Sequence, residues 1–163
     1  MKEKILLSKE GYEQYQKEIE NLETKIREMG QLKAEAYEEA PGDLWHDNFQ
    51  FEDARRQEDI LLVQKNNLVK KKKDIVIVER QKTKNQRIDL GDFVTLELTY
   101  EDGEAEILKV QLVGKWKTDN GQEVQEISLN SPLGKILYQN EKDTFQYKVN
   151  DKIIKVRIIS INT

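Results

Sequence analysis

The sequence predicts an α+β protein: an N-terminal antiparallel coiled-coil hairpin followed by a C-terminal antiparallel β domain with one short helix. Apolar residues in the first part fall at alternating spacings of three and four, the pattern of helices that pack along a seam. From about residue 75 they alternate with polar residues, which is typical of strands. Charged residues make up 36% of the chain against 37% hydrophobic ones, a balance that favours an elongated part over one compact globule.

The first helix is expected over residues 9–39. Ser8 stands before it as an N-cap candidate, and no proline interrupts it before Pro41. At 1.5 Å per residue, such a helix is about 45 Å long. The residues expected in its seam are Tyr12, Tyr15, Ile19, Leu22, Ile26 and Met29.

A second helix is expected over residues 48–74, because Pro41-Gly42-Asp43 ends the first. The connection is short, so the two helices are expected to pack antiparallel, with residues 40–48 as the tip of the hairpin. A thinner seam recurs at steps of seven residues: Ala54, Leu61, Leu68 and Ile75.

The polar segment 81–87 separates the helical from the strand periodicity. It predicts two domains, the hairpin in residues 1–80 and the β domain in residues 81–163. Turn signals predict hairpin connections between the strands of the second domain. They are Asp102-Gly103, Asn120-Gly121 and, more weakly, Asn150-Asp151.

One short helix is expected within the β domain, over residues 132–139. Ser131 is its N-cap candidate, and Pro132 occupies the first helical position, where a missing N–H costs nothing.

The composition excludes several kinds of site. The chain has no cysteine, which excludes disulfides, thiolate metal sites and a cysteine nucleophile, and its one histidine, His46, excludes a multi-histidine zinc site. No apolar run approaches the roughly 18–20 residues of a membrane span. The stretch Ile5-Leu6-Leu7 is too short for a signal peptide. We therefore expect a cytoplasmic protein with no membrane partner.

Charge is segregated along the hairpin. Residues 35–59 hold nine acidic and two basic residues, a net charge of −7, and residues 65–87 hold nine basic and two acidic residues, a net charge of +7. Crowded carboxylates repel one another on a short loop, and they are what a hard cation such as Mg²⁺ recruits. The lysine run at 70–73 fits a nucleic-acid contact and a solvated helix face equally well.

Four segments carry a family resemblance: S-K-E-G-Y from Ser8, G-D-L-W-H-D-N from Gly42, the pair Ala54-Arg55, and N-S-P-L-G-K-I-L from Asn130. In this order, and over nearly the whole chain, they resemble the Gre family of bacterial transcript-cleavage factors. The tip resembles the family's G-D-L-x-E-N, and the last segment resembles its S-P-[LIV]-G/A-x-x-[LI] signature.

The resemblance implies an FKBP-like C-terminal domain that docks on bacterial RNA polymerase at the rim of its secondary channel. The hairpin would enter the channel, where Asp43 and Asp47 help to hold a second Mg²⁺ ion beside the nascent RNA 3′ end. The polymerase then cuts its own transcript, so the factor is not an enzyme. It would have no cofactor when free and would share Mg²⁺ with the polymerase. We expect a monomer.

The same resemblance supplies contact candidates. Those for RNA are Lys70, Lys71, Lys72 and Lys73, and those for polymerase docking are Ser131, Pro132, Leu133 and Gly134.

The tip departs from the family pattern, because His46 stands where the family has its second acid and Asp47 follows one residue later. Either Asp47 still reaches the metal, or the protein only occupies the channel and inhibits. The alternative role of Asp47 is to cap the second helix. His46 is either a group that orients water or a solvated loop residue, and Trp45 either contacts the channel or packs on Phe49 or Phe51.

Two other functional classes are disfavoured. A prolyl isomerase needs an aromatic-lined pocket, and the few aromatic residues of the second domain are needed for its core. A hairpin chaperone would present an apolar tip, whereas this tip is acidic.

Overall fold

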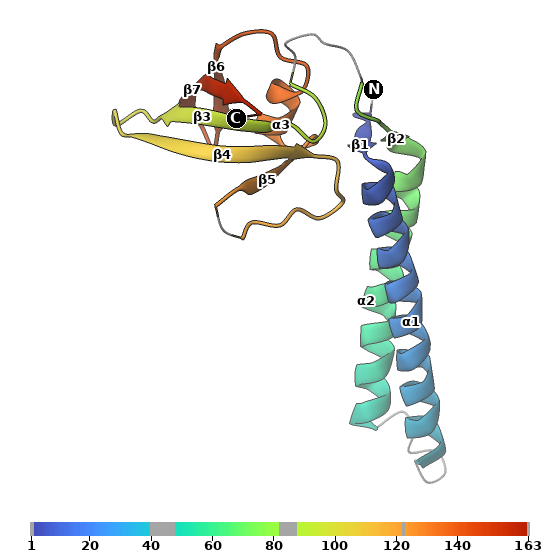
Figure 1. Cartoon of the computed structure of the whole chain (residues 1–163). Helices are drawn as coiled ribbons and strands as arrows, with labels where there is room; N and C mark the ends of the chain where they lie inside the picture. Colours follow the sequence, from blue (N-terminus) through green and yellow to red (C-terminus); the bar gives the residue numbers. More distant parts are fainter. Residues whose placement is uncertain (1, 40–47, 82–87, 122, 163) are drawn as a thin grey trace. The chain divides into compact units, whose positions relative to one another are not determined.

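The computed structural model describes residues 2–39, 48–81, 88–121 and 123–162. By contacts, the chain forms two compact units: Met1–Gln14 with Ile75–Thr163, here the sheet unit, and Tyr15–Asp74, here the hairpin unit. Long helices precede a strand-rich part, which confirms the α+β class (Figure 1).

The hairpin consists of helix α1, Lys9–Glu39, and helix α2, Phe49–Lys71, which ends in a 3-10 turn at Lys72–Asp74. Both helices lie close to their predicted bounds, and they run side by side (Figure 1). Asn48 is the N-cap of α2, because its Oδ1 accepts the N–H of Gln50 at 3.0 Å. The alternative role of Asp47, as the cap of the second helix, is therefore wrong.

Cross-helix contacts confirm the antiparallel pairing. The Tyr15 hydroxyl donates to the carbonyl of Leu68 at 2.5 Å, close to the root of the hairpin. Ion pairs follow toward the tip, Glu23 with Lys65 and Lys33 with Glu58, each at 3.2 Å. The buried seam is thin, however, and four apolar side chains of the hairpin unit are buried among its described residues: Tyr15, Leu22, Ala36 and Ala54.

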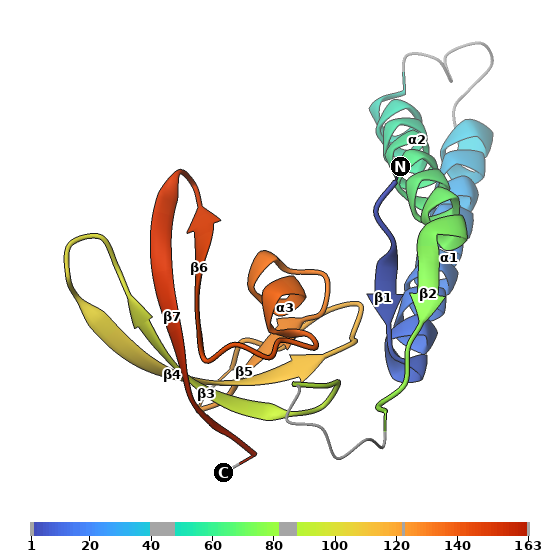
Figure 2. The same cartoon turned by 90° about the horizontal axis from the view of Figure 1, so that it is seen from above.

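The sheet unit contains a five-stranded sheet of order β5-β4-β3-β7-β6, with α3 (Pro132–Leu137) on one face (Figure 2). Its strands are β3 Phe93–Thr99, β4 Ala105–Val113, β5 Gln125–Ser128, β6 Thr144–Val149 and β7 Lys152–Ile161. Three strand pairs are antiparallel, but β4 and β5 are parallel. The prediction of a wholly antiparallel sheet is therefore wrong at this pair. The Asn120-Gly121 turn does not close a hairpin, because the chain from Val113 to Gln125 crosses over to bring β5 in parallel.

The other two turn predictions are confirmed. Gly103 has φ +88° between β3 and β4, and Asn150 and Asp151 both have positive φ, 49° and 65°, between β6 and β7. Positive φ at both central residues gives a turn whose twist matches that of the flanking strands.

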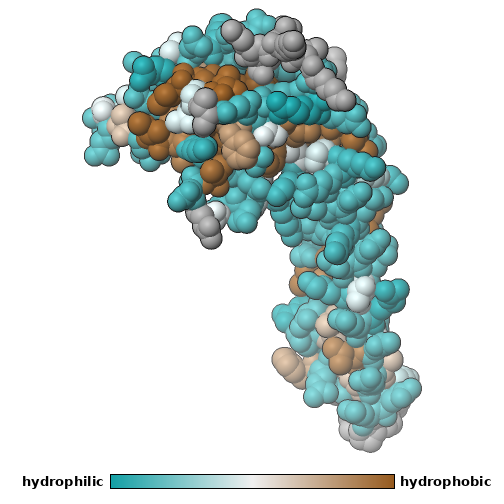
Figure 3. Space-filling view, in the orientation of Figure 1, coloured by the Kyte–Doolittle hydropathy of each residue, from teal (hydrophilic) through white to brown (hydrophobic). Residues whose placement is uncertain are grey.

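The core of the sheet unit lies between one face of the sheet and α3. On β3, Val94, Leu96 and Leu98 are buried at every second position, as a half-buried strand requires. Leu133 and Leu137 of α3 pack into the same cluster. By contrast, the hairpin surface visible in Figure 3 is mainly hydrophilic, with its hydrophobic side chains in small separate patches.

A two-stranded parallel pair, β1 (Ile5–Leu7) with β2 (Ile75–Ile77), was not predicted, because three-residue strands carry no readable periodicity. Through this pair the first residues of the chain join the sheet unit. The compact units therefore differ from the sequence division at residues 80 and 81.

No helix in the described part of the chain is both long and apolar enough to cross a membrane.

Candidate functional site

The predicted tip residues Asp43, Trp45, His46 and Asp47 lie outside the described residues, so their roles stay predictions. The structure does describe the two helix ends that flank the tip. Asn48 donates from its Nδ2 to the carbonyl of Ala36 at 3.0 Å, which holds the start of α2 against the last turns of α1. The two helix ends that flank the tip are therefore joined by a hydrogen bond.

The described flanks of the tip are acidic. Glu35, Glu38 and Glu39 on α1 and Glu52 on α2 are exposed. Glu52 lies in the first turn of α2, where the helix dipole favours a negative charge. These carboxylates leave the distal end of the hairpin negative even without the tip itself.

Two other acids of this region are neutralised by partners within the hairpin. Asp53 pairs with Arg56 at 2.7 Å and also accepts from Gln57 at 2.9 Å. Glu58 pairs with Lys33 of α1.

A groove of about 370 Å³ with a mixed apolar and polar lining lies between the flanking helix ends. Met29, Leu32 and Ala36 line it from α1, and Phe49 and Ala54 line it from α2. Phe49 is 81% exposed, which is unusual for a phenylalanine. Next to the groove, the rings of Tyr37 and Phe51 lie 6.3 Å apart between centroids.

The predicted RNA contacts lie at the opposite end of α2. Lys70 and Lys71 are in its last turn, Lys72 and Lys73 follow in the 3-10 turn, and all four are exposed. The helix dipole favours cations at a helix C-terminus, so helix stability explains the position of these four lysines as well as an RNA contact does.

The four docking candidates differ in accessibility. The Ser131 hydroxyl accepts the N–H of Gly134 at 3.0 Å and caps α3, as predicted. Leu133 is buried in the core, and a Cβ added to Gly134 would lie 1.8 Å from the carbonyl oxygen of Ser128. Pro132 is exposed. The signature therefore builds a turn that presents Pro132, and two of the four residues face inward.

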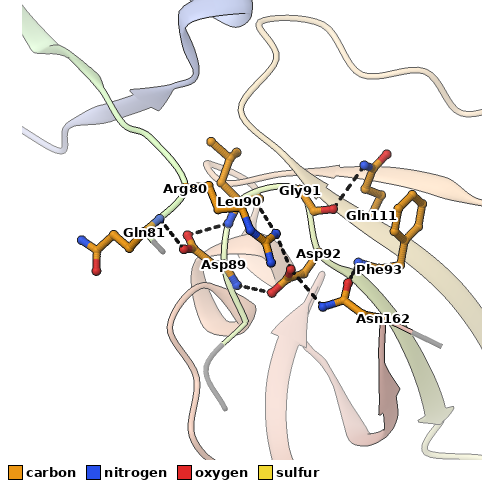
Figure 4. Close-up of polar contacts among 9 residues, drawn as sticks. All are labelled: Arg80, Gln81, Asp89, Leu90, Gly91, Asp92, Phe93, Gln111 and Asn162. Carbon is orange, nitrogen blue, oxygen red and sulfur yellow. Dashed lines mark hydrogen bonds and ion pairs between the residues drawn. The ribbon is translucent and has the colours of Figure 1, made fainter. Parts of the chain in front are cut away.

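A polar network around the buried Asp92, which the sequence did not predict, fastens the segment after β2 to the sheet (Figure 4). Asp92 is 2% exposed and accepts from Arg80 at 2.5 Å and from Asn162 at 3.1 Å through one oxygen. Its other oxygen accepts the N–H of Asp89 at 2.8 Å. The one sequence signal for this network was an acidic residue, Asp92, directly before an apolar strand.

Asp89 extends this network to the chain that leaves β2. Its carboxylate accepts the N–H groups of Gln81 and Leu90, each at 2.7 Å (Figure 4). Arg80 also donates to the carbonyl of Leu90 at 3.0 Å, so residues 80 and 81 are both held beside the segment that leads into β3, the central strand of the sheet.

A second polar pair lies beside the β4–β5 connection. The Lys115 Nζ donates to Glu126 Oε1 at 2.6 Å, and the other carboxylate oxygen of Glu126 accepts the N–H of Asp119 at 2.8 Å. Burial alone would raise the pKa of Glu126, but these hydrogen bonds outweigh it and lower the pKa. The hydrogen bond to Glu126 raises the pKa of Lys115.

Residues 82–163, half of the chain, match the family described as transcription elongation factor GreA/GreB, C-terminal. The chain belongs to this GreA/GreB family. It is 27% identical over 162 residues to "Transcription elongation factor GreA" of Thermosipho melanesiensis, covering 98% of this chain and 97% of that protein. It is 28% identical over 138 residues to the protein of the same name from Chlorobaculum parvum, covering 84% and 82%.

A solved structure, "Crystal structure of Thermus aquaticus Gfh1", is similar at 23% identity with a TM-score of 0.43, covering 99% of this chain and all of the other.

Membership of the GreA/GreB family confirms the resemblance inferred from the four sequence segments and makes the chain a transcription elongation factor of that family. Among the described residues of this GreA/GreB protein, no group of three or more acidic, histidine or cysteine side chains is placed to hold a metal ion.

Proposed function

We propose that this protein binds bacterial RNA polymerase, inserts its hairpin into the secondary channel and stimulates the polymerase's own cleavage of backtracked RNA. The observation that carries the proposal is the hairpin, whose paired helices lead to a single acidic end. Its helices are joined at intervals by the Tyr15–Leu68 bond and by the ion pairs of Glu23 and Lys33. A stiff arm of this kind can deliver carboxylates into a narrow channel.

The chemistry assigned to the tip is electrostatic. Asp43 and Asp47 would share a Mg²⁺ ion with the polymerase, and the ion would supply charge stabilisation for the attacking and leaving oxygens. Mg²⁺ binds few protein carboxylates and keeps several waters unless substrate phosphates complete its shell. The protein's own part is to bring the two acids to the place where the polymerase and the RNA 3′ end provide the other ligands. It would not be an enzyme on its own.

The other surfaces take supporting roles in the proposal. Pro132, which α3 and its cap present at the surface, is the candidate for the docking contact. The lysines at 70–73 would attract the RNA backbone without regard to sequence. The protein would work as a monomer in the cytoplasm, where bacterial polymerase is found.

A second candidate function is inhibition by channel occupation. It is favoured by His46, which replaces the second acid of the family motif and shifts Asp47 by one position. A tip that cannot hold the ion would still fill the channel.

One assay separates the two. The protein is added to a stalled, backtracked polymerase complex with an end-labelled transcript, and the products are resolved on a gel. Shortened transcripts that extend again on addition of nucleotides support cleavage stimulation. Unchanged transcripts with slowed elongation support inhibition, and no effect on either, with no binding to the polymerase, would overturn both.

A further inference from the structure

The first fourteen residues, which belong to the sheet unit, make specific contacts with the rest of that unit that neither the fold nor the family assignment explains. Asn130 pairs with the backbone of Leu6 through both ends of its amide. Its Oδ1 accepts the Leu6 N–H at 2.7 Å, and its Nδ2 donates to the Leu6 carbonyl at 2.8 Å. A single side chain thus satisfies both backbone groups of one residue, as a neighbouring strand would.

A second contact lies two residues further on, where α1 begins. The carbonyl of Gly114 accepts the N–H of Ser8 at 2.9 Å and the Ser8 hydroxyl at 3.2 Å. The same hydroxyl accepts the N–H of Gly11 at 3.0 Å, which caps α1 as predicted. The residue that caps α1 is therefore also hydrogen-bonded to Gly114, the residue that follows β4.

The approach at this point requires glycine on both sides. A Cβ added to Gly11 would lie 1.9 Å from the carbonyl oxygen of Gly114, and one added to Gly114 would lie 2.4 Å from the Ser8 nitrogen. Both contacts are with backbone, which cannot rotate away. One helical turn later, the Gln14 side chain accepts the N–H of Trp116 at 3.1 Å.

We propose that Asn130 and the Gly11–Gly114 contact form an N-terminal clamp, a positioning device that couples the docking turn to the root of α1. Asn130 directly precedes the docking candidates Ser131 and Pro132, and Leu6 lies two residues before the cap of α1. The surface that would hold the polymerase is therefore joined by hydrogen bonds to the start of the arm. This role rests on the proposed function, but the clamp itself is measurable in the free protein.

The chain offers a matched pair of variants. Gly11→Ala should displace the first turn of α1 from Gly114, although alanine favours the helix itself over glycine. Gly30→Ala makes the same change in the same helix, where the new Cβ would meet only the Glu58 carboxylate at 3.6 Å. Asn130→Ala breaks the clamp at an independent point without a steric clash, and Asn120→Ala is its exposed control.

The first measurement uses the free full-length protein. The native chain has no cysteine, so spin labels on Glu28→Cys in α1 and Lys152→Cys in β7 report the distance distribution between the two units by pulsed electron spin resonance. Gly11→Ala and Asn130→Ala should broaden this distribution, and Gly30→Ala and Asn120→Ala should not. Amide exchange at Leu6 should accelerate about tenfold in Asn130→Ala, because its N–H loses its partner. An unchanged distribution and unchanged exchange would overturn the clamp.

The second measurement uses backtracked polymerase complexes. At saturating concentrations, Gly11→Ala and Asn130→Ala should lower the maximal cleavage rate about tenfold or more, because the tip is then misplaced. Gly11→Ala, which lies outside the docking turn, should keep the half-saturating concentration of the wild type. Wild-type cleavage by both clamp variants would overturn the positioning role. If the wild type itself has no effect on the polymerase, the proposed function fails, and the spin-label experiment still decides the clamp.

Discussion

Replacing Asp92 by asparagine should destabilise the sheet unit strongly although it changes only one atom. Both carboxylate oxygens of Asp92 accept hydrogen bonds, one from Arg80 and Asn162 and the other from the Asp89 N–H. Asparagine offers one acceptor and one donor group, so in either orientation its NH₂ faces a donor. The side chain is 3% exposed, so water cannot relieve the conflict.

The size of the effect follows from the bonds lost. A hydrogen bond to a charged group contributes about 1.5–3 kcal/mol, and a buried donor left unpaired costs about 1–3 kcal/mol. We expect a loss of about 3 kcal/mol, which lowers the melting temperature of a unit of this size by more than about 10 °C. Arg80→Ala should cost less, because the Arg80 side chain is half exposed and Asp92 keeps its other two donors.

Scanning calorimetry and urea titration of the full-length protein measure both changes. Asp151→Asn is the control, because its carboxylate is almost fully exposed in the β6–β7 turn and pairs only loosely with Lys148 at 3.5 Å. If Asp92→Asn unfolds within about 0.5 kcal/mol of the wild type, the network does not hold the segment after β2 as described.

Three further predictions concern the hairpin and the sheet. Tyr15→Phe should lower the stability of the hairpin by about 1 kcal/mol, because the hydrogen bond from the Tyr15 hydroxyl to the Leu68 carbonyl is lost. Urea titrations followed by circular dichroism of the helices measure this change, and an unchanged midpoint would contradict it. The pKa of Glu126 is lowered in the folded protein, so its contribution to stability is present above the ordinary glutamate pKa and is lost as pH falls through the lowered value. The urea midpoint of Glu126→Gln should therefore fall less between neutral pH and about pH 3 than the midpoint of the wild type. Parallel curves of midpoint against pH would contradict this. Deleting residues 23–29 and 59–65, which face each other at the Glu23–Lys65 pair, shortens the arm by about 10 Å. Binding to the polymerase should survive this deletion, while stimulation of cleavage should disappear. Retained cleavage would show that the tip does not act in the channel.

The sequence predicted what regular periodicity encodes. The bounds of α1, the pairing of the hairpin, the cap and first position of α3 and two of the three turns follow from spacing and local propensity, and the structure confirms them. The failures concern contacts between residues far apart in the chain. The parallel β4–β5 pair depends on a crossover, because the Asn120-Gly121 signal is local and cannot report which strand lies beside which.

The polar contacts were missed for the same reason. Asn130 meets Leu6 across 124 residues, and Asp92 meets Asn162 across 70. Single side chains in such contacts leave no periodic trace. The docking signature was found from its residue types, but only the structure separates the exposed Pro132 from the inward-facing Leu133 and Gly134.

The central claim is that the hairpin brings Asp43 and Asp47 to the polymerase active site, and transcript cleavage by tip variants across a Mg²⁺ series tests it most directly. Asp43→Asn and Asp47→Asn should each fold as the wild type does, because removing one of several neighbouring negative charges relieves repulsion. Each should cut backtracked RNA far more slowly than the wild type, and higher Mg²⁺ should restore part of the rate, because the ion is then bound with fewer protein ligands. Cleavage at the wild-type rate by both variants at every Mg²⁺ concentration would contradict the claim.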